Sequence, residues 1–206
     1  MVDPFPMFPL GTVLFPSLVL PLHIFEPRYR AMVKHCLDGE PEFGVVLIER
    51  GSEVGGDDVR TDVGTVARIA EAAALPDGRY VLAAVGTRRI RVLEWLTDDP
   101  WPQAAIADFG DTAEAGAGSG ERWVRCRAVL KRVLALATEL GQEVPPLTIE
   151  PSDEPSLGSF QAAALAPLGP ADRQRVLAAP GVDDRLDVLD ALLAEHEEFL
   201  NAQLRA

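Results

Sequence analysis

The sequence has little lysine, cysteine or histidine, and these shortages argue against several classes of enzyme. Lys34 and Lys131 are the only lysines, and neither follows the glycine-rich loop with which nucleotide hydrolases hold phosphate. No serine stands at catalytic spacing from either lysine. The chain also has no Gly-x-Ser-x-Gly segment, the turn on which α/β-hydrolases carry their nucleophile. We therefore expect a protein that is not an enzyme.

The few histidines and cysteines do not form a metal site in the sequence. His23, His35 and His196 are scattered, and no Cys-x-x-Cys, His-x-His or His-x-x-x-His pair occurs, although such spacings are typical of zinc sites. A thiol nucleophile at Cys36, activated by His35, is disfavoured because adjacent helical residues point in different directions. We expect Cys36 and Cys126 to be reduced and packed as small apolar side chains. No metal and no cofactor are predicted.

Positive charge is scarce relative to negative charge along the whole chain. There are 19 Lys and Arg against 32 Asp and Glu, a net charge of −13. Residues 1–110 hold 10 basic and 16 acidic side chains, and residues 111–206 hold 9 and 16. Such surfaces repel phosphate, so nucleic acid and anionic membranes are poor partners. Two cysteines do not make a disulfide framework, which favours a cytoplasmic protein.

One uncharged run resembles a membrane span. Residues 4–22, PFPMFPLGTVLFPSLVLPL, contain no charge, but prolines interrupt them repeatedly, and a proline inside a helix costs about 3 kcal/mol. No Lys or Arg precedes the run, so it lacks the positive start of a signal peptide. The run is typical of buried strands broken by turns, and we expect a soluble chain.

The first half of the sequence has the pattern of short, mostly antiparallel strands. Apolar or alternating segments are separated by Gly, Pro or Asp, and Asp77-Gly78 suits a tight hairpin because Gly tolerates positive φ. The loop GSEVGGDD holds Asp57 and Asp58, which with Asp62 could bind a cation weakly, although a solvated loop explains them more simply. The predicted strands are FPMFPL, LVLPLHIF, EFGVVLIE, GTVARIAEAAAL, RYVLAAVG, RRIRVLEWL and QAAIADF.

One helix interrupts these strands, and helices dominate the second half. Residues 26–37 have an apolar face at helical spacing, followed by Gly39 as a helix stop. The small polar residues 110–121 suit a flexible connection or an exposed loop. The sequence thus predicts an α+β chain with a β-rich part at 1–110 and a helical bundle at 111–206. Helices are expected in 123–140, 155–168, 170–179 and from Asp183 or Asp184 onward.

The segment VLPLHIFEPRYRAM concentrates charge where a strand is predicted to turn into a helix. Pro27 should keep Glu26 out of the helical region and begin the helix itself. Glu26 would then lie near the positive end of the helix. It also stands four residues before Arg30, a spacing at which an ion pair contributes about 0.3–0.5 kcal/mol. Each charge at this joint therefore has a structural role available.

The basic cluster RRIRV lies on another predicted strand. Arg89 and Arg91 should share one face while Ile90 takes the other, which suits a half-buried strand with its charges outward. An anion or a peptide carboxylate could bind there, but a solvated surface accounts for the charges more simply.

Several blocks of the sequence also resemble a known family. MFPLGTVLFPSLVLPLHIFEPRYRAMV, FGVVLIERG, VGTVARI and LPDGRYVLAAVGTRRIRV resemble, in order and spacing, the LON domain, the N-terminal substrate-binding region of the ATP-dependent Lon protease. The resemblance in order and spacing extends over roughly residues 5–108, and weaker motifs in the C-terminal part look like the family's helical subdomain. The residues that carry the signature are Pro9, Leu10, Pro16, His23, Glu26, Pro27, Arg28, Arg30, Asp77 and Gly78.

The resemblance implies a PUA-like β-barrel, or pseudobarrel, with helices packed against it, and one LON domain over the whole chain. Ser17 departs from the family, which commonly has Gly there, and implies a modest change in a turn. The ATPase and Ser/Lys protease domains of Lon enzymes have no counterpart in these 206 residues. The chain thus looks like a free-standing LON-domain protein for which only binding carries over.

We therefore expect a non-enzymatic module that binds exposed apolar or unfolded polypeptide segments, so the partners would be protein or peptide clients. Two alternatives stay open: an adaptor docking onto a protease or another machine through the acidic helical half, and a small-molecule-binding barrel using His23, Arg28 or Arg89. The sequence does not indicate an oligomeric state. The candidate peptide contacts, for each of which a place in the barrel core is the simpler explanation, are Phe8, Leu14, Phe15, Phe25 and Tyr29.

Overall fold

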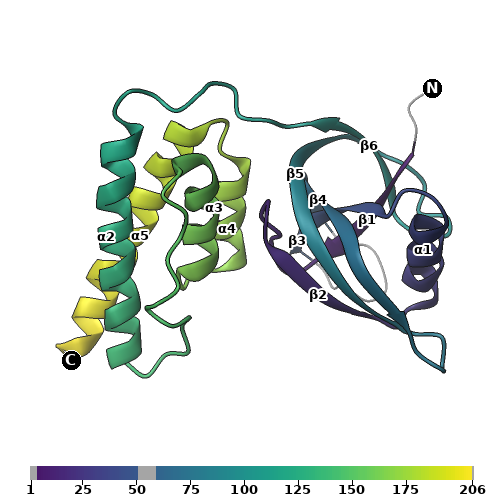
Figure 1. Ribbon diagram of the computed structural model, residues 1–206, viewed down its shortest axis with the longest axis horizontal. Helices are drawn as coiled ribbons and strands as arrows, with labels where there is room; N and C mark the ends of the chain where they lie inside the picture. The colour runs from purple at the N-terminus through teal and green to yellow at the C-terminus, as the bar shows by residue number, and fades with distance from the viewer. Residues whose placement is uncertain (1–3, 51–58, 206) are drawn as a thin grey trace. The chain divides into compact units, whose positions relative to one another are not determined.

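The computed structural model describes residues 4–50 and 59–205, which are drawn in Figure 1. The chain divides into two compact units, Met1–Gly110 and Asp111–Ala206. The first contains the described strands and one helix, and the second is helical. The chain is therefore of the α+β class, as its sequence predicts. The glycine-rich loop with Asp57 and Asp58 lies outside the described residues.

The strands of the first unit form one sheet whose pairing closes on itself. They are β1 (Phe5–Leu10), β2 (Val19–Ile24), β3 (Glu42–Arg50), β4 (Val59–Ala74), β5 (Tyr80–Trp95) and β6 (Gln103–Asp108). Their order is β2-β5-β4-β3-β1-β6, and β6 pairs with β5 as well as with β1. Strands β5, β4, β3, β1 and β6 thus form a closed circuit, to which β2 is joined through β5. The pair β1–β3 is parallel, and the other described pairs are antiparallel.

Strand β5 is one long strand, although the sequence predicts two shorter ones separated at Gly86. That prediction is wrong because Gly86 does not turn the chain. A Cβ at this position would lie 2.3 Å from the carbonyl oxygen of Phe15, so only glycine lets the Phe15 loop approach. Ser17 donates its N–H to the Gly86 carbonyl at 2.7 Å, and Gly86 donates its own to the Leu18 carbonyl at 2.9 Å. The glycine is a fastening point for the loop before β2.

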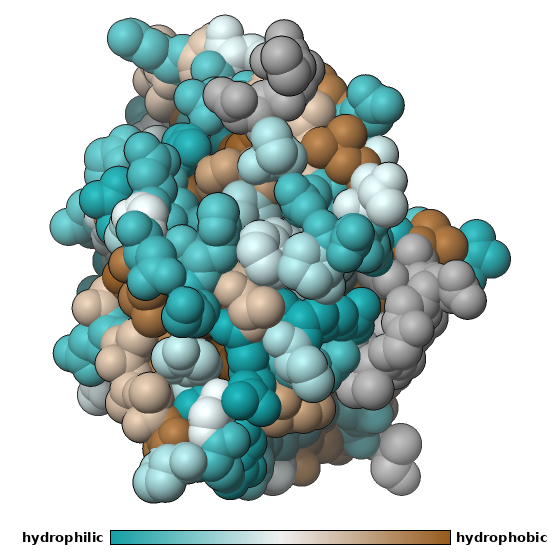
Figure 2. All heavy atoms as spheres, turned by 90° about the vertical axis from the view of Figure 1, so that its right-hand side faces the viewer, coloured by the Kyte–Doolittle hydropathy of each residue, from teal (hydrophilic) through white to brown (hydrophobic). Residues whose placement is uncertain are grey.

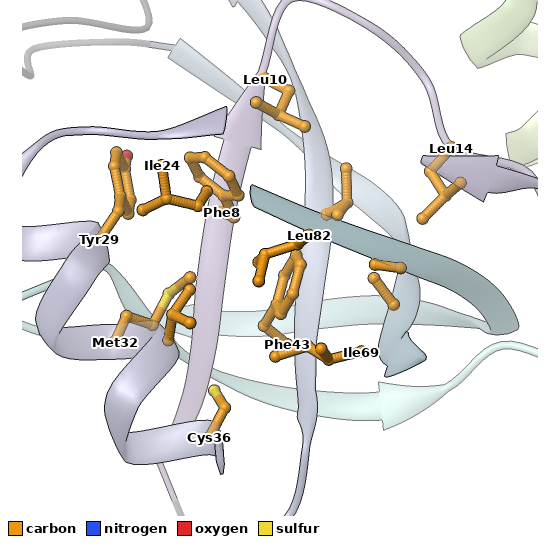
Figure 3. Packing of buried hydrophobic residues seen from close by; sticks show 14 residues of the cluster. Phe8, Leu10, Leu14, Ile24, Tyr29, Met32, Cys36, Phe43, Ile69 and Leu82 are labelled. Carbon is orange, nitrogen blue, oxygen red and sulfur yellow. The ribbon is translucent and has the colours of Figure 1, made fainter. Parts of the chain in front are cut away.

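Helix α1 (Pro27–Asp38) covers part of the core of the first unit. Pro27 occupies its first turn, as expected. Its buried face carries Tyr29, Met32, Val33 and Cys36, and Figure 3 shows Met32 and Cys36 pointing toward side chains from the sheet. The apolar spacing in the sequence therefore predicts this helix and its buried face.

A buried glutamate links four strands. Glu42, at the start of β3, is 7% exposed. It accepts hydrogen bonds from Arg68 of β4 at 2.7 Å and from Arg88 of β5 at 3.0 Å. Arg88 also bonds Asp108 at the end of β6 at 2.9 Å. Burial by itself would raise the pKa of Glu42, but the hydrogen bonds from the two arginines outweigh it and hold the pKa below its usual value.

The second unit is a bundle of α2 (Ser119–Glu139), α3 (Pro155–Leu165), α4 (Pro170–Ala178) and α5 (Val182–Leu204). Helices α2 and α5 run side by side (Figure 1), and ion pairs join them at Arg122–Asp187 and Arg132–Glu197. No helix in the described part of the chain is long and apolar enough to cross a membrane.

The polar segment after Gly110 is exposed but tied to α5. Arg185, which is 0% exposed, bonds both carboxylate oxygens of Asp111, at 2.7 and 3.0 Å. Further along, Asp183 accepts hydrogen bonds from the Gly116 N–H at 3.1 Å and the Ser119 hydroxyl at 2.5 Å. Of the two expectations for this segment, the exposed loop describes it better than the flexible connection.

The first prediction concerns acid sensitivity. Because Glu42 has a lowered pKa in the folded state, its ion pairs stabilise the protein above the unfolded pKa of about 4.3 and are lost as pH falls through the folded value. Glu42→Gln should lower the free energy of unfolding by about 1–3 kcal/mol at pH 7. The difference should shrink at about pH 3, as protonation removes the same charge. Urea unfolding at both pH values tests this. Glu40→Gln, an exposed neighbour, is the control, and equal losses in both variants would contradict the assignment.

The second prediction concerns Ser17, a non-glycine residue with positive φ, 64°. The left-handed region costs a residue with a Cβ about 1–2 kcal/mol. Glycine avoids this cost, but it loses more conformational entropy on folding, which cancels part of the gain in stability. Ser17→Gly should therefore raise the free energy of unfolding by about 0.5 kcal/mol. Urea denaturation measures the change. Ser17→Ala keeps the Cβ and should give no gain, and a gain in that variant would show that backbone strain is not the cause.

Candidate functional site

A hollow of about 220 Å³ lies where β2 meets α1. It lies within the first unit and is bounded by residues of β1, β2, the turn after β2, and α1. Most of its walls are apolar or aromatic, and two polar side chains, His23 and Glu26, contribute to them. The lining residues are Phe8, Leu10, Pro21, Leu22, His23, Ile24, Phe25, Glu26 and Tyr29.

Pro27 sets the geometry of this hollow. Glu26 is extended, with φ −67° and ψ 136°, as steric repulsion from a following proline requires. The chain therefore leaves β2 abruptly and begins α1 at the next residue. Tyr29, two positions later, packs its ring on that of Phe8 with centroids 4.2 Å apart, a close aromatic pair. Figure 3 shows Tyr29, Ile24 and Phe8 grouped at one end of the buried cluster.

The charges at the joint pair differently from the prediction. The Glu26 carboxylate bonds Arg28, with Nε 3.1 Å from Oε2, and its link to Arg30 is through the backbone alone, where the Arg30 N–H donates to the Glu26 carbonyl at 2.9 Å. The i,i+4 spacing fails because Glu26 is extended and stands outside the helix, so its carboxylate does not project along the helical surface. The Arg28 guanidinium also lies over the Tyr29 ring, 4.6 Å from its centroid. Glu26 makes no side-chain cap hydrogen bond either.

The structure brings together three of the five candidate peptide contacts. Phe8, Phe25 and Tyr29 line the hollow, whereas Leu14 and Phe15 do not. Leu14 is 4% exposed and Phe15 1%, and Figure 3 shows Leu14 at the opposite end of the buried cluster from Tyr29.

The loop that carries Leu14 and Phe15 is held inward by two contacts. The Thr65 hydroxyl donates to the Leu14 carbonyl at 2.6 Å, and Gly86 allows the close approach of Phe15. The apolar character of this stretch therefore does not show which of its residues are buried and which are exposed.

Exposed apolar side chains lie at the hollow and on the strands β2 and β5. Phe25 is 54% exposed, Val19 64% and Val81 46%, and Val81 is the register partner of His23. On the face drawn in Figure 2, apolar residues form small groups among polar ones. A local hollow with an exposed aromatic rim is thus the apolar feature that could hold a ligand side chain.

The basic cluster on β5 is not an open anion site. Arg89 is 5% exposed, so the prediction that it faces solvent is wrong. Its guanidinium lies 4.6 Å from the Phe109 ring centroid, and that of Arg91 lies 4.5 Å from the same centroid. Arg91 also bonds Asp62 at 3.0 Å. These two arginines pack on Phe109, the residue that follows β6, a role that strand alternation alone does not predict.

The thiols are buried, as the sequence predicts. Burial raises the pKa of Cys36 to about 11, and burial together with nearby Asp190 raises that of Cys126 to about 12. Both thiols are therefore protonated and unreactive at neutral pH. Within residues 4–50 and 59–205, no group of three or more His, Cys, Asp and Glu side chains is placed to hold a metal ion.

Comparisons with solved structures identify the fold as that of an N-terminal domain of Lon proteins. The Lon N-terminal domain protein from Xanthomonas campestris is 27% identical, with a TM-score of 0.68 over 92% of this chain and 98% of that one. The N-terminal domain of the Mycobacterium avium complex Lon protease has a TM-score of 0.67 over 94% of this chain and 100% of that one. Its identity is 17%, so it supports the fold alone.

The sequence comparisons agree. The model of the ATP-dependent protease La (LON) substrate-binding domain matches residues 4–195, so the chain belongs to this family. Lon protease from Escherichia coli K12 is 27% identical over 97% of this chain and 26% of its own length. Lon protease 2 from Herpetosiphon aurantiacus is 24% identical over 96% and 24%. The chain thus spans about a quarter of these relatives, and the region it shares with them is the substrate-binding domain.

The effects of two phenylalanine substitutions on the protein's stability should distinguish a residue at the rim of the hollow from one in its wall. Phe8 is 7% exposed and packs in the core, so Phe8→Ala should cost about 3–5 kcal/mol. Phe25→Ser should change the free energy of unfolding by less than about 0.5 kcal/mol, since its side chain is half exposed. Denaturant unfolding measures both. A large loss in Phe25→Ser would show that Phe25 is a core residue rather than a rim residue.

Proposed function

We propose that this protein is a non-enzymatic binding module for exposed apolar segments of polypeptides, and that the hollow between β2 and α1 is its binding site. Membership of the LON substrate-binding family supports a protein-binding role. The observation that carries the choice of site is an apolar hollow with a half-exposed phenylalanine, Phe25, at its rim. The closed circuit of strand pairing supports a PUA-like pseudobarrel as the scaffold of this site.

The size of the hollow suits one large apolar side chain as an anchor. Burying one Leu, Ile, Phe or Met side chain contributes about 1.5–3 kcal/mol. That contribution is well below the 8.2 kcal/mol of micromolar binding. Affinity for a client segment must therefore combine the anchor with contacts along the rim, at Phe25, Val19 and Val81. Weak and broad recognition of unfolded segments follows from such an arrangement.

The free edge of β2 offers limited main-chain pairing beside the hollow. Gly86 donates its backbone N–H to the Leu18 carbonyl. Because hydrogen-bonded and non-hydrogen-bonded positions alternate in an antiparallel pair, the backbone N–H and C=O groups of the even-numbered residues of β2 point toward β5, and those of the odd-numbered residues point away from it. The outward residues are Val19, Pro21 and His23, and Pro21 has no N–H to donate. A client strand would find donors at Val19 and His23 alone, and a proline on an edge also discourages uncontrolled sheet extension.

The remaining partner assignments follow from charge. A net charge of −13 argues against nucleic acid and anionic membranes as partners and favours neutral or basic client segments.

Buried, unbridged thiols suit a reducing compartment, which supports a cytoplasmic location. Cooperation with a protease is a natural extension of the family's role and is part of this proposal.

Peptide binding tests the proposed function. A fluorescently labelled extended peptide with apolar residues at alternate positions should bind saturably, and its analogue with Ser at those positions should not. Phe25→Ser should weaken binding about tenfold, equivalent to about 1.4 kcal/mol, as expected for loss of a rim contact. Fluorescence anisotropy measures each affinity.

The matched control is Phe199→Ser, because Phe199 is equally exposed, at 57% against 54% for Phe25, but lies on α5 in the second unit. It should bind the peptide like the unmodified protein. Equal losses in the two variants, or no saturable binding of the apolar peptide, would contradict the proposed site.

A further inference from the structure

Arg30 lacks the partner that the sequence predicts for it. Its expected partner, Glu26, bonds Arg28 instead. The Nε of Arg30 is buried and makes no hydrogen bond among the described residues, and its guanidinium forms no ion pair with any of them. A buried donor without an acceptor costs about 1–3 kcal/mol. We infer that Arg30 is the centre of a binding site for an oxyanion, a carboxylate or phosphate group that its guanidinium would hold in the hollow it lines.

Arg30 opens onto a second hollow, which shares no lining residue with the apolar one. Its volume is about 390 Å³, and it lies between α1 and the β4–β5 hairpin. The lining includes two cations and a tyrosine and no acidic side chain. The lining residues are Pro27, Arg30, Ala31, Lys34, Gly78 and Tyr80.

Gly78 makes room for the guanidinium. This residue has φ 78°, and a Cβ on it would lie 2.1 Å from the Nη2 atom of Arg30. The glycine therefore serves two purposes, the positive φ of the hairpin turn and the seat of the Arg30 side chain. The hairpin fixes the guanidinium in place, so its donors are oriented before an anion arrives.

The nearby acidic groups do not neutralise the hollow. Asp77 accepts hydrogen bonds from the Arg79 side chain at 2.7 Å and from its backbone N–H at 3.1 Å. Asp38 lies 3.6 Å from Lys34, with both side chains about 70% exposed, and an exposed pair of this kind contributes little. Arg30 and Lys34 thus present positive charge to the hollow, although the chain as a whole is acidic.

The donor set defines the ligand. A guanidinium presents parallel N–H groups that match two oxygens of a carboxylate or phosphate, and a lysine adds a mobile point charge. The Tyr80 hydroxyl can donate as well. The shared chemistry is an oxyanion, either carboxylate or phosphate, and a titration with each distinguishes the two.

The experiment is a titration of the full chain, labelled with ¹⁵N, first with inorganic phosphate and then with acetate at constant ionic strength. The Arg30 Nε–H and Gly78 N–H resonances should shift together and saturate with at least one of the anions. Arg30→Gln should weaken binding at least about tenfold, the effect of losing a charge-assisted bidentate contact. Arg28→Gln removes the same charge outside the hollow and should change the affinity less than about twofold, since screened charges at a distance act weakly.

Lys34→Gln gives a second test, because this exposed side chain can be replaced without loss of folding even if Arg30→Gln does not fold. It should weaken binding about threefold, as one partly screened charge would. Shifts that do not saturate, or that Arg30→Gln and Lys34→Gln leave unchanged, would overturn the site and show non-specific ion binding only. Peptide affinity for the apolar hollow is independent of either result.

Discussion

The steric demand of Pro27 on the residue before it shapes the part of the first unit where both hollows lie. Because Glu26 must stay extended and Pro27 starts a helix, β2 ends and α1 begins within two residues. This abrupt change of direction seats Tyr29 on Phe8 and closes one wall of the apolar hollow. The Glu26 carboxylate pairs with Arg28 rather than with Arg30, and the Arg30 guanidinium lies against Gly78 of the hairpin. Both hollows are consequences of one backbone constraint.

The sequence predicts what depends on local chemistry and fails where contacts are distant. Helix α1 and its buried face follow from apolar spacing, and the hairpin follows from Asp77-Gly78. By contrast, the extended course of β5 through Gly86 depends on a loop some seventy residues earlier in the chain. The burial of Arg89 depends on Phe109, which follows β6. Neither partner can be identified from the neighbourhood of the residue it affects.

The candidate contacts show the same division. Phe8, Leu14, Phe15, Phe25 and Tyr29 are all apolar or aromatic and lie close together in the sequence, so composition cannot rank them. The structure separates them by backbone contacts: Leu14 is drawn inward by Thr65, while Phe25 stands at the turn that Pro27 creates. Exposure, rather than apolar character itself, therefore distinguishes Phe25 from Leu14 and Phe15 as a candidate contact.

The chain has a surplus of acidic side chains, so Arg30 lacks an acidic partner because of its position and not because such partners are scarce. Acidic side chains close to Arg30 exist, but each is committed to another cation: Glu26 to Arg28, Asp77 to Arg79. The guanidinium is held against Gly78 at a point that neither carboxylate reaches. Since a charged donor gains most from an acceptor where water is partly excluded, the same packing that denies Arg30 an internal partner makes it receptive to an external one.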